Sequence, residues 1–220
     1  MTFKQIVESL TAIAIMVLML SPIYGLATDS DPKGVAVRIG WQIPAATQGQ
    51  ITQVLKRTDA LENRGLNPTF VPYSFGTPQV EAALAGKLDV IFSGDQPAIN
   101  MITQGGSWKI AARLTYDRVA LMVPKNSPIK EIKDLRGKTV ASPFGSIAHR
   151  EAVIWEQAAG LDSDEDVNNV DMDILDIRKL VTAGGGEKWG EVDAVAVWES
   201  STSYFELDQL ARKLETTPTL

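Results

Sequence analysis

The feature that most constrains the fold is a regular alternation of short apolar runs with amphipathic segments. Between residues 35 and 114, each strand-length apolar run is followed by a segment with helical spacing of its apolar residues. This alternation is typical of β-α units, because parallel strands need a crossover connection that usually contains a helix. A second series of the same kind begins at residue 119. The sequence therefore predicts an α/β fold in two similar halves.

The predicted elements can be placed from these runs and from their turn residues. In the first half we expect strands at 35–40, 69–73, 88–93 and 108–114, and helices at 48–63, 77–86 and 97–104. In the second half we expect strands at 119–124, 138–142, 171–176 and 193–198, and helices at 129–137, 147–159 and 204–214. Thr77 and Pro78 begin a helix in the usual way, with a hydroxyl cap followed by proline in the first turn. Pro72 favours an edge position for its strand, since proline cannot donate to a sheet.

The N-terminal segment indicates export. Lys4 precedes an uncharged run over 9–20, and small residues lead up to a cleavage position after Ala27. The apolar run is shorter than the roughly 20 residues that span a bilayer, which disfavours a membrane anchor. We therefore predict a cleaved signal peptide at 1–27 and a periplasmic location.

Composition removes several classes of function. The chain contains no cysteine, which excludes cysteine-ligated zinc, thiol catalysis and a lipoprotein anchor. The formal net charge is −6 at pH 7, without the basic surface that nucleic acid requires. Asp162, Asp164 and Asp166 begin like a calcium loop, but Val167 stands where that loop needs glycine. We expect no metal site, no cofactor and no nucleic-acid partner.

Four segments resemble, in the same order, the periplasmic substrate-binding proteins of ABC importers for nitrate, sulfonates and taurine, a family that includes thiamine-precursor binders. The segments are VRIGWQ, GTPQVEAALAGKLDVIFSGDQPAI, SPIKEIKDLRGKTVASPFGSIAHREAV and EVDAVAVWES. The block DLRGKTVA, followed by GS and a histidine, is the most specific. The resemblance implies the type II periplasmic binding protein fold. In this α/β fold each of two lobes is a mostly parallel sheet flanked by helices, and the lobes close around a ligand by hinge bending.

The resemblance also implies a division into domains. Residues 28–116 would form lobe 1, residues 117–200 would form lobe 2, and residues 201–220 would begin the return to lobe 1. The first hinge crossover would lie at 115–118. Members of the family usually continue beyond this point, so we expect the C-terminal part of lobe 1 to be truncated in this chain.

The segment SPFGSIAHR, residues 142–150, places glycine and serine directly before a predicted helix. The first N–H groups of a helix lack intrahelical partners and carry partial positive charge, so such a loop can bind an anion. Gly145 allows close approach of the backbone, and Ser146 can cap the helix or donate to a ligand. Arg150 can pair with an oxyanion or remain a solvated helix residue. A lone histidine such as His149 is more often structural, although the resemblance places it near the ligand.

Three loops of the first half follow predicted strands, and open α/β sheets bind ligands at the carboxyl ends of their strands. Two of these loops precede helix N-termini, so both lobes could direct N–H donors into one cleft. Asp95 is unusual beside an anion: it either caps its helix or meets an amino group of the solute. The candidate ligand-binding residues from these loops are Gln42, Ser74, Phe75, Gly76, Ser93, Gly94, Asp95 and Gln96.

Trp198 and Glu199 end the strand predicted at 193–198, and the resemblance implies that this position faces the cleft. Trp41 and Trp198 could form apolar walls for the tail of a solute. Core packing of either tryptophan is the alternative.

The residues and the resemblance together predict a non-enzymatic, monomeric solute receptor without catalytic residues. It would bind a small anionic or zwitterionic solute, such as a sulfonate, taurine or nitrate, and deliver it to an ABC transporter permease in the inner membrane. A thiamine-pyrimidine-precursor binder, an enzyme on the same fold, and a sensor or incomplete domain are the alternatives. One histidine and no cysteine disfavour the enzyme.

Overall fold

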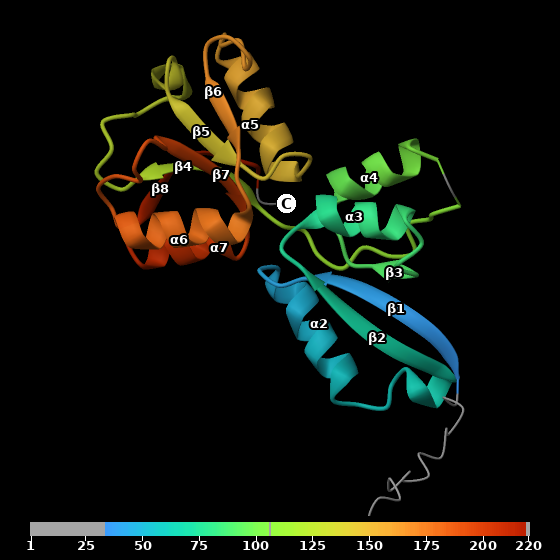
Figure 1. The fold of residues 1–220 in the computed structure, drawn as a ribbon. Helices are drawn as coiled ribbons and strands as arrows, with labels where there is room; N and C mark the ends of the chain where they lie inside the picture. The colour runs from blue at the N-terminus through green and yellow to red at the C-terminus, as the bar shows by residue number, and fades with distance from the viewer. Residues whose placement is uncertain (1–33, 106, 219–220) are drawn as a thin grey trace, which may run out of the picture.

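The computed structural model describes residues 34–105 and 107–218, which form two sheets flanked by helices (Figure 1). The strand order is β2-β1-β3 in the first sheet and β6-β5-β7-β4-β8 in the second. The predicted signal peptide at 1–27 lies outside the described residues. None of the helices that the structure describes combines the length and the apolarity that a membrane crossing requires. The α/β architecture in two halves is as predicted.

The first sheet is entirely parallel. Strand β1 (Val35–Gln42) lies between β2 (Leu66–Tyr73) and the short strand β3 (Val90–Ile91). The chain crosses from β1 to β2 on one side of β1, and then from β2 to β3 on the other side. Because parallel crossovers are right-handed, these opposite directions place the two connecting helices on opposite faces of the sheet. Figure 1 shows this arrangement, with α2 (Ala46–Lys56) on one face and α3 (Gly76–Leu84) on the other.

Strand β3 is held beside β1 by an arginine and an aspartate. The backbone N–H of Arg38 donates to Asp89 Oδ2 at 2.8 Å, and Arg38 Nε donates to the same oxygen at 2.9 Å. These hydrogen bonds from Arg38 lower the pKa of Asp89 to about 2. The carboxyl ends of β1 and β3 therefore lie next to each other. Pro72 lies in β2, an edge strand, as predicted.

The second sheet is mixed. Strand β4 (Val119–Pro124) runs antiparallel to both of its neighbours, and all six of its residues are buried. Strand β5 (Thr139–Ser142) runs parallel to β6 (Asn168–Asp171) and to β7 (Ala194–Trp198). The flanking helices are α5 (Ile147–Ala158), α6 (Ile174–Gly184) and α7 (Ser201–Leu207). In Figure 1, α6 and α7 lie together on one face and α5 lies on the other.

Most of the described core belongs to the second sheet, where Leu121 and Phe205 are fully buried. The core of the first sheet is much smaller, and its cluster of buried apolar residues consists of Val80, Ala83, Leu88 and Met101. Phe75, from the loop after β2, packs partly buried against the larger cluster. The two halves therefore share an apolar contact.

Several predicted elements of the chain are wrong or shorter than expected. Residues 108–114 form no strand, because no neighbouring backbone pairs with them, and Ile110 is 64% exposed. The helix predicted at 129–137 is only the 3-10 turn η2 (Ile132–Leu135). The helix predicted at 48–63 ends with α2, and a separate 3-10 turn, η1 (Glu62–Arg64), follows.

The strand predicted at 171–176 is also wrong. Strand β6 ends at Asp171, the first residue of that range, and Asp173 begins helix α6 by accepting a hydrogen bond from the backbone N–H of Leu175 at 2.8 Å. A carboxylate in this position satisfies an N–H group that would otherwise lack a partner, which favours helix over strand.

The C-terminal segment also differs from expectation. Residues 204–214 were predicted to form one helix, but α7 ends earlier and strand β8 (Ala211–Thr216) follows. Strand β8 pairs with β4, which needs a hydrogen-bonding neighbour on each side because its backbone is buried. Residues 211–216 therefore add an edge strand to the second sheet, and the expected return of the chain to lobe 1 stays a prediction.

Candidate functional site

Three helix N-termini meet at the gap between the two sheets. Near the start of α3, Thr77 Oγ1 donates to the carbonyl oxygen of Phe144, in the loop before α5, at 3.0 Å. On α5, Arg150 Nη1 donates to Oε1 of Gln96, in the first turn of α4 (Asp95–Thr103), at 2.9 Å. Figure 1 shows α3 and α4 beside one end of α5. The predicted ligand loops of both halves are thereby brought together.

Two glycines make this close approach possible. A Cβ atom on Gly76 would lie 2.4 Å from Cγ of Pro97, so glycine is needed to pack the start of α3 against α4. A Cβ atom on Gly145 would lie 2.8 Å from Thr77 Oγ1, and Gly145 has a φ of +77°. Side chains other than glycine rarely adopt that φ. The prediction that Gly145 allows a close approach of the backbone agrees with this geometry, although the partner is α3.

Helices α3 and α4 begin without a side-chain cap from the described residues. Their N-cap residues are Phe75 and Gly94, and neither makes a capping hydrogen bond. The prediction that Thr77 caps α3 is wrong, because the helix already begins at Gly76, and the Thr77 hydroxyl donates across the gap. Both first turns therefore present the positive end of the helix dipole. The first turn of α3 also presents backbone N–H groups, whereas in α4 the N–H of Gln96 donates to Asp95. Beside the start of α3, the buried Ser93 hydroxyl has no hydrogen-bond partner among residues 34–105 and 107–218.

Helix α5 is capped. Ser146 is buried, and its Oγ accepts a hydrogen bond from the backbone N–H of His149 at 3.3 Å. Of the two roles considered for Ser146, the cap is therefore observed. A hydroxyl that accepts from the backbone still carries its own proton, so donation from Ser146 to a solute oxygen stays a prediction.

The guanidinium group of Arg150 is held by carboxylates of the protein. Arg150 Nη2 donates to Glu151 Oε1 at 2.8 Å and lies 3.6 Å from Asp95 Oδ2. Asp95 Oδ1 also accepts from the backbone N–H of Gln96 at 2.7 Å, within the first turn of its own helix. Asp95 thus contacts both the first turn of its own helix and Arg150. Its contact with an amino group of the solute stays a prediction. A bidentate interaction of the Arg150 guanidinium with an oxyanion would require Arg150 to release Glu151.

The ring of His149 stacks on Phe144, with 4.1 Å between the ring centroids. Burial lowers the pKa of His149, and the nearby carboxylate of Asp171 opposes this effect only in part. The imidazole is therefore neutral near pH 7, and it contributes a flat aromatic surface rather than a charge.

Gln42 and Ser74 lie at the ends of β1 and β2. Gln42 is 4% exposed, and its Nε2 lies 3.5 Å from Gln79 Oε1 and from the carbonyl oxygen of Phe92. Its amide is therefore used to join β1 to the chain after β3. Ser74 is partly buried in the loop after β2.

Trp198 and Glu199 make the contacts described here with other residues of the second half of the chain. Trp198 is only 6% exposed and belongs to the larger core cluster. Of the two roles considered for it, core packing is the one observed. Glu199 forms an ion pair with Arg118, and its Oε2 accepts from the backbone N–H of Ser203 at 3.2 Å. Burial alone would raise the pKa of Glu199, but these hydrogen bonds outweigh it and lower the pKa below its usual value.

Sequence reasoning missed some of the contacts across the gap. The Ser200 hydroxyl donates to the carbonyl oxygen of Pro44 at 3.3 Å, although 156 positions separate them. No local signal identifies such a pair. Gln79 could have been found from its position on the apolar stripe of α3, and in the structure it is fully buried. The part of the chain that the structure describes contains no group of His, Asp and Glu side chains suited to a metal ion.

Comparison with known proteins agrees with this architecture. A family model described as "ABC transporter, phosphonate, periplasmic substrate-binding protein" matches residues 44–173. A "Putative aliphatic sulfonates-binding protein" of Escherichia coli K12 is 28% identical over 203 residues, which cover 87% of this chain and 57% of the relative. A Bacillus subtilis 168 protein of the same name is 30% identical over 144 residues, which cover 64% of this chain and 41% of the relative.

Solved structures give the same result. The alkanesulfonate-binding protein of Xanthomonas axonopodis pv. citri, bound to MOPS, superposes with a TM-score of 0.66 at 26% identity, covering 84% of this chain and 61% of that one. The periplasmic aliphatic sulphonate-binding protein of Escherichia coli superposes with a TM-score of 0.58 at 26% identity, covering 82% and 56%. The chain thus spans 41% to 57% of the length of the two curated relatives. By its matching family model and its fold, the chain belongs to the periplasmic substrate-binding proteins of ABC transporters.

Proposed function

We propose that this chain is an extracytoplasmic solute-binding protein. It binds a small oxyanion-bearing solute of the sulfonate kind and delivers it to an ABC importer permease in the inner membrane. It is exported by a signal peptide cleaved after Ala27, and it acts as a monomer. Residues 28–116 and 117–200 act as the two lobes, and the solute lies between them.

The observation that carries this proposal is the pair of uncapped helix N-termini at the gap. Phe75 leaves the first N–H groups of α3 without a side-chain partner among the described residues. Gly94 does not cap α4, where the N–H of Gln96 is bonded to Asp95 Oδ1. The buried Ser93 hydroxyl lies beside them. Neutral donors of this kind suit an oxyanion, because they bind several oxygens without a buried counter-charge.

The charged groups at the gap favour a zwitterion over a simple anion. Asp95 and Glu151 together carry one negative charge more than Arg150 can balance, which is unfavourable beside a bare anion. An amino group on the solute would restore the balance at Asp95. A taurine-like solute, with its sulfonate at the helix N-termini and its ammonium near Asp95, fits this charge pattern.

Isothermal titration calorimetry on the purified chain tests the proposal. The solutes are taurine, ethanesulfonate, nitrate and a thiamine pyrimidine precursor. We expect heat from the sulfonates, with taurine the tighter of the two. Binding of the pyrimidine alone would support the precursor-binding alternative, and no heat from any solute would overturn the proposal.

The enzyme alternative has little support at this site. A serine nucleophile needs a histidine side chain as its base, but Ser146 bonds to the backbone N–H of His149. The His149 ring is instead stacked on Phe144. We therefore propose that the protein has no catalytic residues.

A further inference from the structure

The chain passes from the first half to the second through a long exposed connection. Within the described part of the chain, the two sheets are joined once, by the residues between α4 and β4. In Figure 1 this connection is the yellow-green coil that leads into β4. Residues 109–117 are all exposed, and Ile110 and Tyr116 have exposed fractions of 64% and 62%. We call residues 109–117 the connecting segment.

The backbone of the connecting segment is not paired. Among residues 34–105 and 107–218, no residue outside the segment forms a hydrogen bond with its N–H or carbonyl groups, and the segment forms neither helix, strand nor turn. Before it, Trp108 packs partly buried against the smaller core cluster. After it, the carbonyl oxygen of Arg118 accepts from the backbone N–H of Glu199 at 3.1 Å. The segment is therefore held at its two ends.

The contacts inside the segment are weak. The guanidinium carbon of Arg113 lies 4.0 Å from the centroid of the Tyr116 ring, and Thr115 Oγ1 donates to the carbonyl oxygen of Tyr116 at 3.4 Å. An exposed cation–π contact contributes little to stability. Regions with few buried contacts and solvent-exposed backbone open at low cost in free energy. The connecting segment can therefore enter the cleft of an endoprotease as an extended strand while the rest of the protein stays folded.

Two peptide bonds of the segment suit an endoprotease that cuts after basic residues. Such an enzyme binds the lysine or arginine before the cut in a pocket that contains a carboxylate. Lys109 and Arg113 are both exposed, and so are the residues that follow them, Ile110 and Leu114. Both sides of each bond are therefore accessible.

Basic residues elsewhere in the described chain do not combine these properties so well. Lys188 is exposed, but Trp189, which follows it, is fully buried. Arg118 is followed by Val119, which is only 2% exposed and begins β4. Cutting after either residue would require a buried strand or side chain to come out of the core. The accessible neighbours, rather than the positive charge, distinguish the connecting segment.

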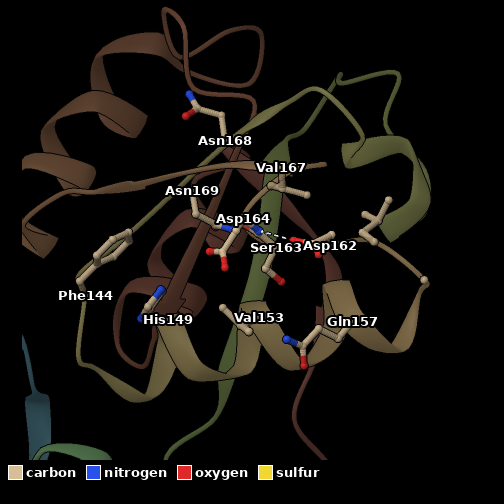
Figure 2. Close-up of a pocket in the computed structure, with 12 residues that line it drawn as sticks. Phe144, His149, Val153, Gln157, Asp162, Ser163, Asp164, Val167, Asn168 and Asn169 are labelled. Atoms are coloured by element: carbon tan, nitrogen blue, oxygen red, sulfur yellow. Dashed lines mark hydrogen bonds between the residues drawn. The ribbon is translucent and has the colours of Figure 1, made fainter.

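Exposure of side chains is not sufficient either. Asp162, Asp164 and Glu165 are exposed, but Asp162 Oδ1 accepts from the backbone N–H groups of Asp164 at 2.9 Å and of Glu165 at 3.1 Å. Figure 2 shows Asp162 and Asp164 across a hollow from Val153 and Gln157 of α5. That turn is tied by its own hydrogen bonds, whereas the connecting segment is not.

The two halves should respond differently to a cut. The second sheet has five strands and a large core, whereas the first has three strands and a cluster of four buried apolar residues. A unit with so small a core is marginally stable by itself. After the cut, contacts across the gap, such as that from Thr77 to Phe144, are all that joins the first half to the second. The first half should therefore unfold and be degraded.

We infer that the connecting segment is a proteolytic cleavage site for an endoprotease that cuts after lysine or arginine. At Arg113 the bond to the nitrogen of Leu114 is hydrolysed: water gives its hydroxyl to the carbonyl carbon of Arg113 and its proton to that nitrogen. The cut separates the loops of the first half from helix α5. On the basis of the proposed function, it abolishes solute binding.

Limited digestion of the purified chain with trypsin tests the inference, with fragments identified by mass spectrometry. Within residues 34–218, we expect the first new N-termini at Ile110 and Leu114. A fragment that begins at Leu114 should then persist while the first half disappears. An earlier cut at another bond of this range, or loss of both halves at equal rates, would overturn the inference.

A matched pair of variants separates the site from general attack on basic residues. The double substitution Lys109→Gln and Arg113→Gln changes two exposed side chains and should fold normally. It should slow loss of the intact 34–218 region by more than about tenfold, because the remaining sites are cut only after unfolding. Lys188→Gln, at an exposed lysine beside a buried tryptophan, should leave the rate unchanged. Equal rates for the double variant and the parent chain would exclude the site.

Calorimetry with ethanesulfonate before and after digestion keeps the inference apart from the proposed function. Heat from the uncut chain that disappears after the cut would support both. Undiminished heat from the cut chain would contradict the loss of solute binding. No heat from the uncut chain would remove the proposed function for this solute, and the cleavage site would still be judged by the positions of the new N-termini.

Discussion

Arg150 joins the two halves of the molecule through Gln96, with 2.9 Å between Nη1 and Oε1. The same guanidinium group is 3.6 Å from Asp95 and 2.8 Å from Glu151. One cation therefore links α5 to the N-terminus of α4 and is shared between two acids. An anionic solute at this N-terminus must compete with those acids for Arg150, which makes them determinants of solute charge.

We expect Asp95→Asn to tighten binding of ethanesulfonate by about two- to fivefold, the value of a partly exposed ion pair. The substitution removes a competing carboxylate but keeps a side chain that can accept from Gln96. Taurine should gain less than ethanesulfonate, or should weaken, if its amino group meets Asp95. Calorimetry with both solutes gives the ratio, and Asp208→Asn is the control for loss of an exposed acid. Equal gains for both solutes would show that Asp95 does not contact the amino group.

Gly76→Ala should reduce the free energy of unfolding by about 1–3 kcal/mol, because its Cβ would overlap Pro97. The matched control is Gly49→Ala in α2, where the nearest neighbour of the new Cβ would be the Trp41 ring at 3.8 Å. Alanine there should raise stability by about 0.5–1 kcal/mol, since it lowers the entropy lost on folding. Urea denaturation measures both. Similar values for the two variants would contradict the close approach of α3 and α4.

Ser146→Ala should cost about 1 kcal/mol of stability through loss of the α5 cap. Asp173→Ala removes the cap of α6 and should cost about the same. If Ser146 also donates to the solute, only its variant should weaken sulfonate binding, by about two- to tenfold for one hydrogen bond. Equal affinities for the two variants would limit Ser146 to the cap.

Stability should also depend on pH through Glu156. This side chain is fully buried, and burial raises the pKa of its carboxyl group above the usual value. The folded state therefore retains the proton to higher pH than the unfolded state, so this contribution is full at low pH and declines as the pH rises past the unfolded pKa.

Glu156→Gln removes this titration and keeps an oxygen that can accept from Asn169. We expect the variant to match the parent chain near pH 4 and to be the more stable protein at pH 8. Glu165→Gln, at an exposed acid, is the control and should show no such pH-dependent gain. Denaturation curves at both pH values measure the difference. A constant difference between Glu156→Gln and the parent chain at the two pH values would contradict a raised pKa.

Much of the fold was predictable because its signals are local. The apolar runs of β1, β4 and β7 and the capped start of α5 at Ser146 are all visible in neighbouring residues. The incorrect predictions concern segments whose structure depends on pairing with another strand. Residues 108–114 have strand composition but no partner, whereas 211–216 were predicted to be helical but pair with β4. A strand is stable only when a second backbone satisfies its hydrogen bonds, and that backbone is distant in sequence.

The sequence by itself determined the order of the β-α units and the loops that hold Gly76, Gly94 and Gly145, because turns and caps depend on adjacent residues. Only the tertiary structure decided how those loops are used. It directs Thr77 away from its own helix and divides Arg150 between Gln96 and two acids. The physical reason is that a polar side chain takes the best partner within reach, and folding brings together partners that are far apart in the chain.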